Sequence, residues 1–148
     1  LKLIKDARIL DSNGAVVLDY PATPGTTNIP TALIQPGRFI EYRITYTNIS
    51  IAPVGAGNVT LNAGNVVITE NGTIAPNNWA IDQDANGVID TSNVVASATA
   101  TYGSITYSPS GDQSGNTQTT DVTQYVNSVG ISIQPGASGT FTFRRRIN

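Results

Sequence analysis

The sequence predicts an all-β fold, an antiparallel immunoglobulin-like β-sandwich of about eight or nine strands. Thr, Asn, Ser, Gly and Val are abundant and only 12% of the residues are charged, a composition that favours strands. Apolar and polar residues alternate in several short runs between turn signals, and no stretch has the spacing and caps of a helix longer than one or two turns. A jelly roll is the alternative sandwich. At 148 residues, the chain is expected to be one domain, 1–148.

The first half of the chain opens on an alternating strand, residues 1–10, followed by a Pro-punctuated loop at about 20–31. Ile-Gln-Pro-Gly at 34–37 reads as a turn, because Pro presets the first turn dihedral and Gly accepts a positive one. The next run, residues 40–46, places Ile40, Tyr42, Ile44 and Tyr46 on one face, which predicts a half-buried strand.

In the second half, residues 59–63 alternate until Gly64, where the phase shifts and a bend is expected. Residues 94–102 form another alternating run of mostly small side chains. The polar tract 108–120 predicts a long exposed loop. A second Ile-Gln-Pro-Gly at 133–136 leads into the closing strand, in which Phe141, Phe143 and Ile147 share a face.

Charge and residue usage exclude several classes of function. The net charge of -2 and pI near 4.8 argue against a nucleic-acid partner, and no apolar span suits membrane insertion. Cys, His and Met are absent, so thiol or imidazole catalysis and soft-metal sites are excluded, and we expect no enzyme. The start at Leu1 suggests a processed or excised piece, and the composition suggests an extracellular one. Sequons at Asn48, Asn58 and Asn71 are interpreted as chance matches in an Asn-rich chain.

The best site candidate is the segment 82–90, which spaces hard oxygen ligands as a calcium-binding loop does. The predicted metal ligands are Asp82, Asp84, Asn86, Val88 through its carbonyl, and Asp90, with Gly87 at the bend. The sequence departs from the calcium-loop pattern at the twelfth position, where Asn93 stands in place of the expected Glu. The lower ligand charge predicts weaker calcium binding. The alternative is an Asp/Asn/Gly turn without a metal.

Two cations fall on faces that the alternation assigns to the core. Lys5 shares the face of Leu1, Leu3, Ala7 and Ile9 and therefore needs a partner. One hypothesis is an amide bond from Lys5 to Asn48, which lies on the inward face of its strand. The favoured interpretation is that Lys5 sits at a bulge or reaches out from an edge strand. Arg145 points to the face of Phe141 and Phe143, which predicts a bulge or a partner.

Catalysis by a carboxylate pair is not supported, because Asp82, Asp84 and Asp90 lie in one short loop. Sugar stacking by exposed aromatic rings is conceivable for five residues, although core packing is expected for most of them. These residues are Tyr20, Trp79, Tyr102, Tyr107 and Tyr125.

Four segments are similar to the "conserved repeat domain" of large prokaryotic cell-surface proteins. They are 1–5 (LKLIK), 38–50 (RFIEYRITYTNIS), 57–60 (GNVT) and 135–148 (PGASGTFTFRRRIN). The resemblance implies an immunoglobulin-like extracellular module used in stalks, adhesion or filaments, often in tandem, without enzymatic activity.

Two functions are therefore expected. The first is a structural module, a subunit or repeat of a surface filament, stalk or layer, which pairs with itself or with neighbouring domains through the terminal strands 1–10 and 141–147. The second is a carbohydrate- or ligand-binding accessory module of a surface adhesin or enzyme.

Overall fold

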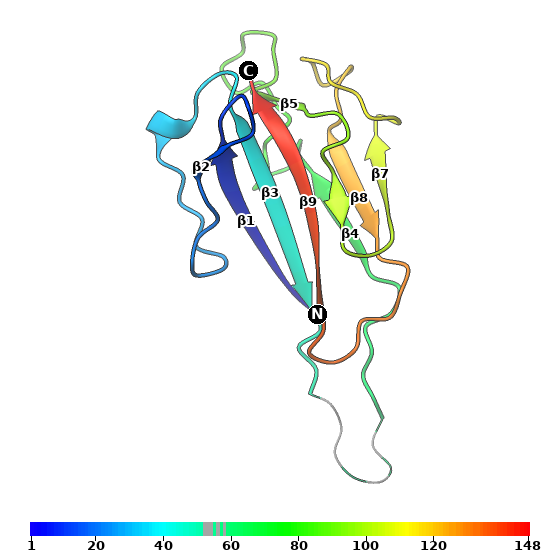
Figure 1. The fold of residues 1–148 in the computed structure, drawn as a ribbon. Coiled ribbons are helices and arrows are strands. Elements are labelled where there is room, and N and C mark those ends of the chain that lie inside the picture. Colours follow the sequence, from blue (N-terminus) through cyan, green and yellow to red (C-terminus); the bar gives the residue numbers. More distant parts are fainter. Residues whose placement is uncertain (52–54, 56, 58) are drawn as a thin grey trace.

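The structure is a computed structural model that describes residues 1–51, 55, 57 and 59–148, and it confirms the predicted antiparallel β-sandwich (Figure 1). Its one helical element there is the 3-10 turn Thr31–Leu33, so no helix in this part of the chain could cross a membrane. The strands are β1 (Lys2–Leu10), β2 (Val16–Leu18), β3 (Phe39–Thr47), β4 (Val67–Asn71), β5 (Thr91–Asn93), β6 (Thr99–Ala100), β7 (Ser104–Ser108), β8 (Gln124–Ser128) and β9 (Ser138–Ile147).

The larger sheet has the order β2-β1-β3-β9-β5, with β6 also paired to β9. All of its pairs are antiparallel, and β3 pairs along its whole length with β1 on one side and β9 on the other. The smaller sheet has the order β4-β8-β7 and packs against the larger one (Figure 1). The first and last strands of the chain therefore lie on either side of β3.

Both Ile-Gln-Pro-Gly segments form the turns that the sequence predicts. Gly37 and Gly136 have φ angles of 85° and 78°, in the left-handed region that favours glycine. The N–H of Arg38 donates to the carbonyl of Gln35 at 3.1 Å, and the N–H of Ala137 donates to Gln134 at 3.0 Å. Strands β3 and β9 begin directly after these turns, so the repeated motif sets the start of the two central strands.

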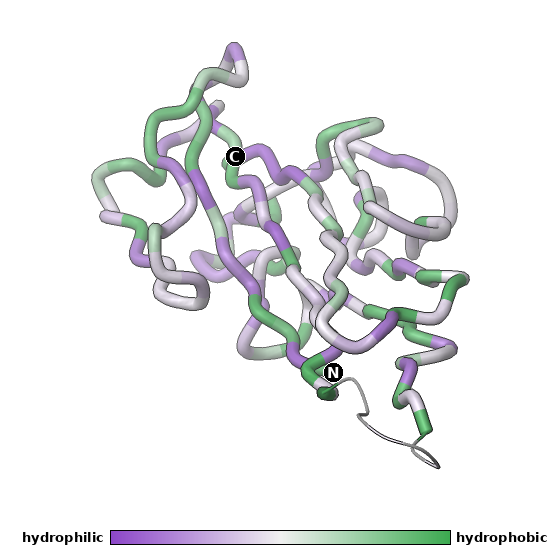
Figure 2. The backbone as a smooth tube through the Cα atoms, turned by 60° about the horizontal axis from the view of Figure 1, so that its bottom comes forward, coloured by the Kyte–Doolittle hydropathy of each residue, from purple (hydrophilic) through white to green (hydrophobic). Residues whose placement is uncertain are grey.

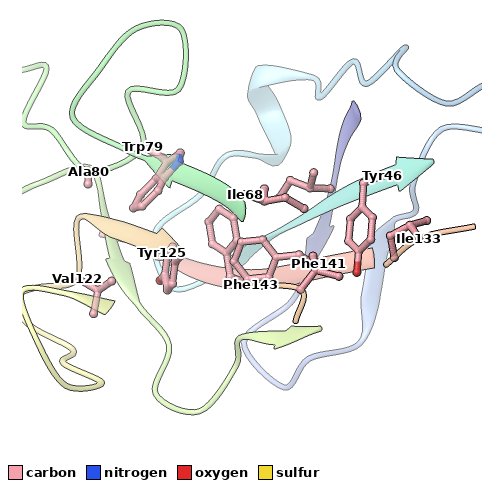
Figure 3. Close-up of a cluster of buried hydrophobic side chains, with 11 residues drawn as sticks. Tyr46, Ile68, Trp79, Ala80, Val122, Tyr125, Ile133, Phe141 and Phe143 are labelled. Atoms are coloured by element: carbon pink, nitrogen blue, oxygen red, sulfur yellow. The ribbon is translucent and has the colours of Figure 1, made fainter. Parts of the chain in front are cut away.

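The main core lies between the sheets and is dominated by aromatic rings (Figure 3). Tyr125 and Phe143 have ring centroids 4.4 Å apart, and Trp79 lies 5.3 Å from Phe143 and 5.4 Å from Tyr125. Gly72 makes this packing possible, because a Cβ atom there would lie 2.3 Å from the Trp79 ring. The aromatic cluster thus joins β8 and β9 to the segment that follows β4.

Two alternating runs do not form the continuous strands that their pattern suggests. Residues 59–63 contribute only an isolated bridge between Ala63 and Ile133, and the chain bends at Asn65, beside the expected Gly64. The run 94–102 is broken by a turn in which Ala96 has a φ angle of 58°. β5 ends before this run, at Asn93, whose buried N–H donates to Asp121, and within the run only Thr99–Ala100 forms a strand, β6.

Candidate functional site

The loop 82–90 brings together three of the predicted metal ligands. Oxygen atoms of Asp82, Asp84 and Asp90 all lie within 4.8 Å of one another. Two oxygen ligands that are each about 2.3–2.6 Å from one ion are at most about 5.2 Å apart, so these three carboxylates could share a metal ion. Three neighbouring carboxylates also repel one another, which a divalent cation would offset.

Hydrogen bonds within the loop also fit the turn interpretation. Asp82 accepts from the N–H groups of Gly87 at 2.7 Å and Asn86 at 3.1 Å. Although desolvation opposes them, these backbone hydrogen bonds lower the pKa of Asp82, which keeps its carboxylate ionised. Asn86 uses its carboxamide oxygen to accept from the N–H of Val88 at 2.8 Å.

The twelfth position of the motif does not contribute a ligand. Asn93 is buried in β5, where its side chain donates to Asp112 at 2.6 Å and accepts from the Tyr125 hydroxyl. Its oxygen is therefore committed to the core. Because Asn93 stands where a calcium-binding loop has its Glu ligand, the loop has no fourth carboxylate, and the cluster consists of the three aspartates.

A groove of about 630 Å³ runs beside this loop. The loop residues Asp84, Asn86 and Asp90 line it. Its lining also includes the apolar Ile34 and Ile40, so the groove combines acidic and apolar side chains. Trp79 borders it but is only 3% exposed, which leaves little ring surface for a ligand.

The second cluster surrounds Lys5, which faces the interior, as the alternation of its strand indicated and against the favoured interpretation that it sits at a bulge or reaches outward. Its ammonium group forms an ion pair with Glu70 and donates to Oδ1 of Asn77 at 2.8 Å. The Tyr42 ring centroid lies 4.8 Å from the Lys5 nitrogen. Burial lowers the pKa of Lys5, although the Glu70 charge and hydrogen bond oppose this shift.

The hypothesis of an amide bond between Lys5 and Asn48 is wrong. Lys5 lies opposite Ile44 in the β1–β3 register, four residues before Asn48, which is about 13 Å along a strand. Asn48 is buried and donates its amide group to the carbonyls of Leu61 and Ile133, both at 2.8 Å. The bulge interpretation is also wrong, because the β1 irregularity lies between Ile9 and Leu10, away from Lys5. The outward reach from an edge strand is wrong as well, because the ammonium group turns inward to Glu70 and Asn77. Sequence alone had no signal for Glu70 and Asn77, which are distant along the chain.

Arg145 has the partner that its position in the core requires. Its guanidinium group forms an ion pair with Asp121 at 2.6 Å, and both side chains are fully buried. It also donates to the carbonyls of Thr91 at 2.6 Å and Val122 at 2.7 Å. The guanidinium group also lies 4.7 Å from the centroid of the Trp79 ring. Arg145 is therefore a buried structural residue and is not an exposed anion-binding group.

The outer face of the larger sheet carries a charge cluster around Glu41. This carboxylate accepts from Arg8 at 2.7 Å, Arg144 at 2.5 Å and the Tyr20 hydroxyl at 2.8 Å. Desolvation favours the neutral acid, but the hydrogen bonds from Arg144 and Tyr20 and the Arg8 charge outweigh it and lower the pKa of Glu41.

The aromatic candidates separate into two groups. Trp79 and Tyr125 are core residues and cannot stack a ligand in this fold, as core packing predicted. Tyr20, Tyr102 and Tyr107 are half-buried. Tyr20 already lies against the guanidinium groups of Arg43 and Arg8, at 3.8 Å and 4.8 Å from its centroid.

Of the three sequons, Asn48 is buried and Asn71 uses its side-chain oxygen to accept from the N–H of Thr73 at 2.9 Å. Asn58 lies outside the described residues. A glycan on Asn48 is incompatible with this fold, which agrees with the interpretation of that sequon as a chance match.

Comparisons of the chain with family models, with curated proteins and with solved structures found no match.

Proposed function

We propose that this chain is an extracellular structural module without catalytic activity, a subunit or repeat of a prokaryotic surface filament, stalk or layer. It assembles with copies of itself or with neighbouring domains through strand β1. The similarity to the conserved repeat domain and the low-charge, Thr- and Asn-rich composition support the extracellular setting.

The open edge of β1 is the observation that carries this proposal. Among the described residues, β1 pairs with β3 over its full length, but with β2 only at Ile9 and Leu10. The N–H of Ala7 points away from β3 and donates to Thr27 Oγ1 at 3.0 Å. Because backbone direction alternates along a strand, the N–H groups of Leu3 and Lys5 also point to this edge, where a partner strand can add.

Apolar side chains are exposed at the same end of the molecule. Leu1 and Leu3 are 50% and 56% exposed, and Figure 2 shows hydrophobic residues there near the N-terminus. The neighbouring segments add further exposed apolar residues: Ile49, Ile51, Val59 and Leu61. Burying these side chains would add apolar contact to backbone pairing.

The closing strand is not available for this pairing. β9 lies between β3 and the short strands β5 and β6, so both of its edges are occupied over much of its length. The proposal therefore narrows the expected assembly, which involved both terminal strands 1–10 and 141–147, to β1 alone.

Electron microscopy of the purified protein, with and without a calcium chelator, tests the assembly. Ordered fibres or sheets would support a self-assembling subunit, and their loss with the chelator would link the loop 82–90 to assembly. Dispersed monomers at every protein concentration would contradict self-assembly.

The proposal includes a calcium ion bound by Asp82, Asp84 and Asp90, with Asn86 and the Val88 carbonyl as additional oxygen ligands. An ion that binds only the folded state stabilises it by about 2.7 kcal/mol at a hundredfold excess over Kd. Thermal melts should therefore shift upward with calcium in the wild type but not in Asp84→Asn. Asp19→Asn removes an exposed carboxylate elsewhere and should retain the shift, and an unchanged wild-type melt would refute calcium binding.

The groove beside the loop supports a second candidate, a carbohydrate- or ligand-binding accessory module of a surface adhesin or enzyme. Its acidic and apolar side chains would suit a polar ligand with an apolar face. A glycan array tests this function, and binding that is lost in Asn86→Ala would favour it over assembly.

A further inference from the structure

We propose that Lys5 and Asn77 form an intramolecular amide cross-link, with the Glu70 carboxyl group carrying the proton between the two nitrogen atoms. This inference is independent of the proposed assembly, because it rests only on three side chains that meet inside one chain.

The geometry places a nucleophile beside an amide carbon. Lys5 Nζ lies 2.8 Å from Oδ1 of Asn77. Because a C=O bond is about 1.23 Å long, the Asn77 Cγ atom can be no more than about 4 Å from Nζ. That separation is close to the roughly 3–3.5 Å of a near-attack arrangement, so a small side-chain rotation suffices.

Glu70 is positioned to exchange protons with this amine. Its side chain is 11% exposed and pairs directly with Lys5 Nζ. The rings of Tyr42 and Phe143 lie 4.8 Å and 5.9 Å from the same nitrogen. The Lys5 side chain is 27% exposed, and its partial burial lowers the pKa of Lys5, although the Glu70 charge opposes this shift. Transfer of a proton from Lys5 to Glu70 gives the neutral, nucleophilic amine and a protonated carboxyl group.

The reaction balances without any further reagent. The lone pair of Lys5 Nζ attacks Cγ of Asn77 to form a new C–N bond, and the protonated Glu70 stabilises the developing charge on Oδ1. The bond from Cγ to Nδ2 then breaks. The protonated Glu70 gives its proton to Nδ2, which leaves as ammonia, and the Glu70 carboxylate takes the proton that Nζ loses. One amine and one primary amide become one secondary amide and ammonia, with no oxidation or reduction.

A cavity of about 570 Å³ adjoins the reacting groups and is lined in part by Lys5, Pro76 and Asn77. Ammonia formed there has a route to solvent, which makes the reaction effectively irreversible.

The cross-link would join the two sheets. Lys5 lies in the middle of β1 in the larger sheet, whereas Asn77 follows β4 of the smaller sheet. A covalent bond here would prevent β1 from separating from the sandwich under load. In a chain without cysteine, it replaces the disulfide that could otherwise serve this purpose.

Intact mass measurement of the denatured wild-type protein tests the proposal. The expected mass is lower than the sequence mass by about 17 Da, the mass of ammonia, and fragmentation should connect residues 5 and 77. Lys5→Arg and Glu70→Gln should both give the full mass. Lys2→Arg changes an exposed lysine of the same strand and should retain the loss.

A wild-type chain at its full sequence mass would overturn the cross-link, whatever the variants do. Succinimide formation at Asn13-Gly14, Asn71-Gly72 or Asn86-Gly87 also releases ammonia, so a mass loss that persists in Lys5→Arg would overturn the cross-link as well. A cross-link that persists in Glu70→Gln would overturn the role assigned to Glu70.

Discussion

Arg145 shows how a single charged residue can organise a core. Removing its partner leaves a guanidinium group buried without a counter-charge, so Asp121→Asn should lower the free energy of unfolding by about 3–5 kcal/mol. Urea denaturation measures this change. Arg146→Gln alters the exposed neighbour and should have little effect.

The buried Arg145–Asp121 ion pair need not stabilise the fold more than a well-packed apolar pair would. Replacing both members, as in Arg145→Met with Asp121→Leu, should recover much of the stability lost by Asp121→Asn, because no unpaired charge remains. A double variant less stable than Asp121→Asn would show that the network of hydrogen bonds around Arg145 matters more than the charge balance.

Glu41 makes the free energy of unfolding depend on pH in the acidic range. Its folded-state pKa is lowered relative to the unfolded chain, where a glutamate titrates near 4.3. The ionised form therefore stabilises the fold above that pH, and the contribution is lost as the pH falls through the lower folded pKa. Denaturation midpoints should decline more steeply below about pH 4.3 in the wild type than in Glu41→Gln. Equal slopes would contradict this role.

At the level of the elements, Gly72 is required by the packing of Trp79. A methyl group there would overlap the indole ring, so Gly72→Ala should destabilise the fold by about 1–3 kcal/mol. At Gly64 an added Cβ meets its nearest atom at 3.7 Å, which is ordinary contact. Gly64→Ala therefore serves as the control, and equal losses in urea denaturation would contradict the packing argument.

The β1 edge can be tested by removing one backbone donor. Leu3→Pro deletes an N–H that points away from β3, and proline is tolerated on edge strands, so folding should survive. Sedimentation velocity should show assembly lost in Leu3→Pro and only weakened in Leu3→Ala, which removes the apolar side chain but keeps the donor. Equal assembly in both variants would exclude strand pairing at this edge.

The elements also show what the sequence could predict. Alternation and the repeated Ile-Gln-Pro-Gly turns identified β3, β9 and their buried faces, because both signals are local. The runs 59–63 and 94–102 were misjudged, since local alternation carries no information on which strand is available as a partner. The three aspartates of the loop 82–90 were found because they lie within nine residues, whereas Glu70 and Asn77 meet Lys5 only through the packing of the two sheets.

At the scale of the whole molecule, the sandwich is held by contacts between its two sheets. The aromatic cluster packs between them, the Arg145–Asp121 pair links β9 to the loop before β8, and the Lys5 cluster links β1 to the segment after β4. The proposed assembly would therefore use surfaces outside this interior, the open edge of β1 and the exposed apolar residues beside it.

Hydrogen exchange of the backbone amides, compared between dilute and concentrated protein, tests assembly through β1 most directly. The amides of Leu3 and Lys5 should exchange rapidly when the protein is dispersed and slowly when it is assembled, while that of Arg43 in the centre of the sheet stays protected in both. Rapid exchange at Leu3 and Lys5 in an assembled sample would contradict the proposed interface.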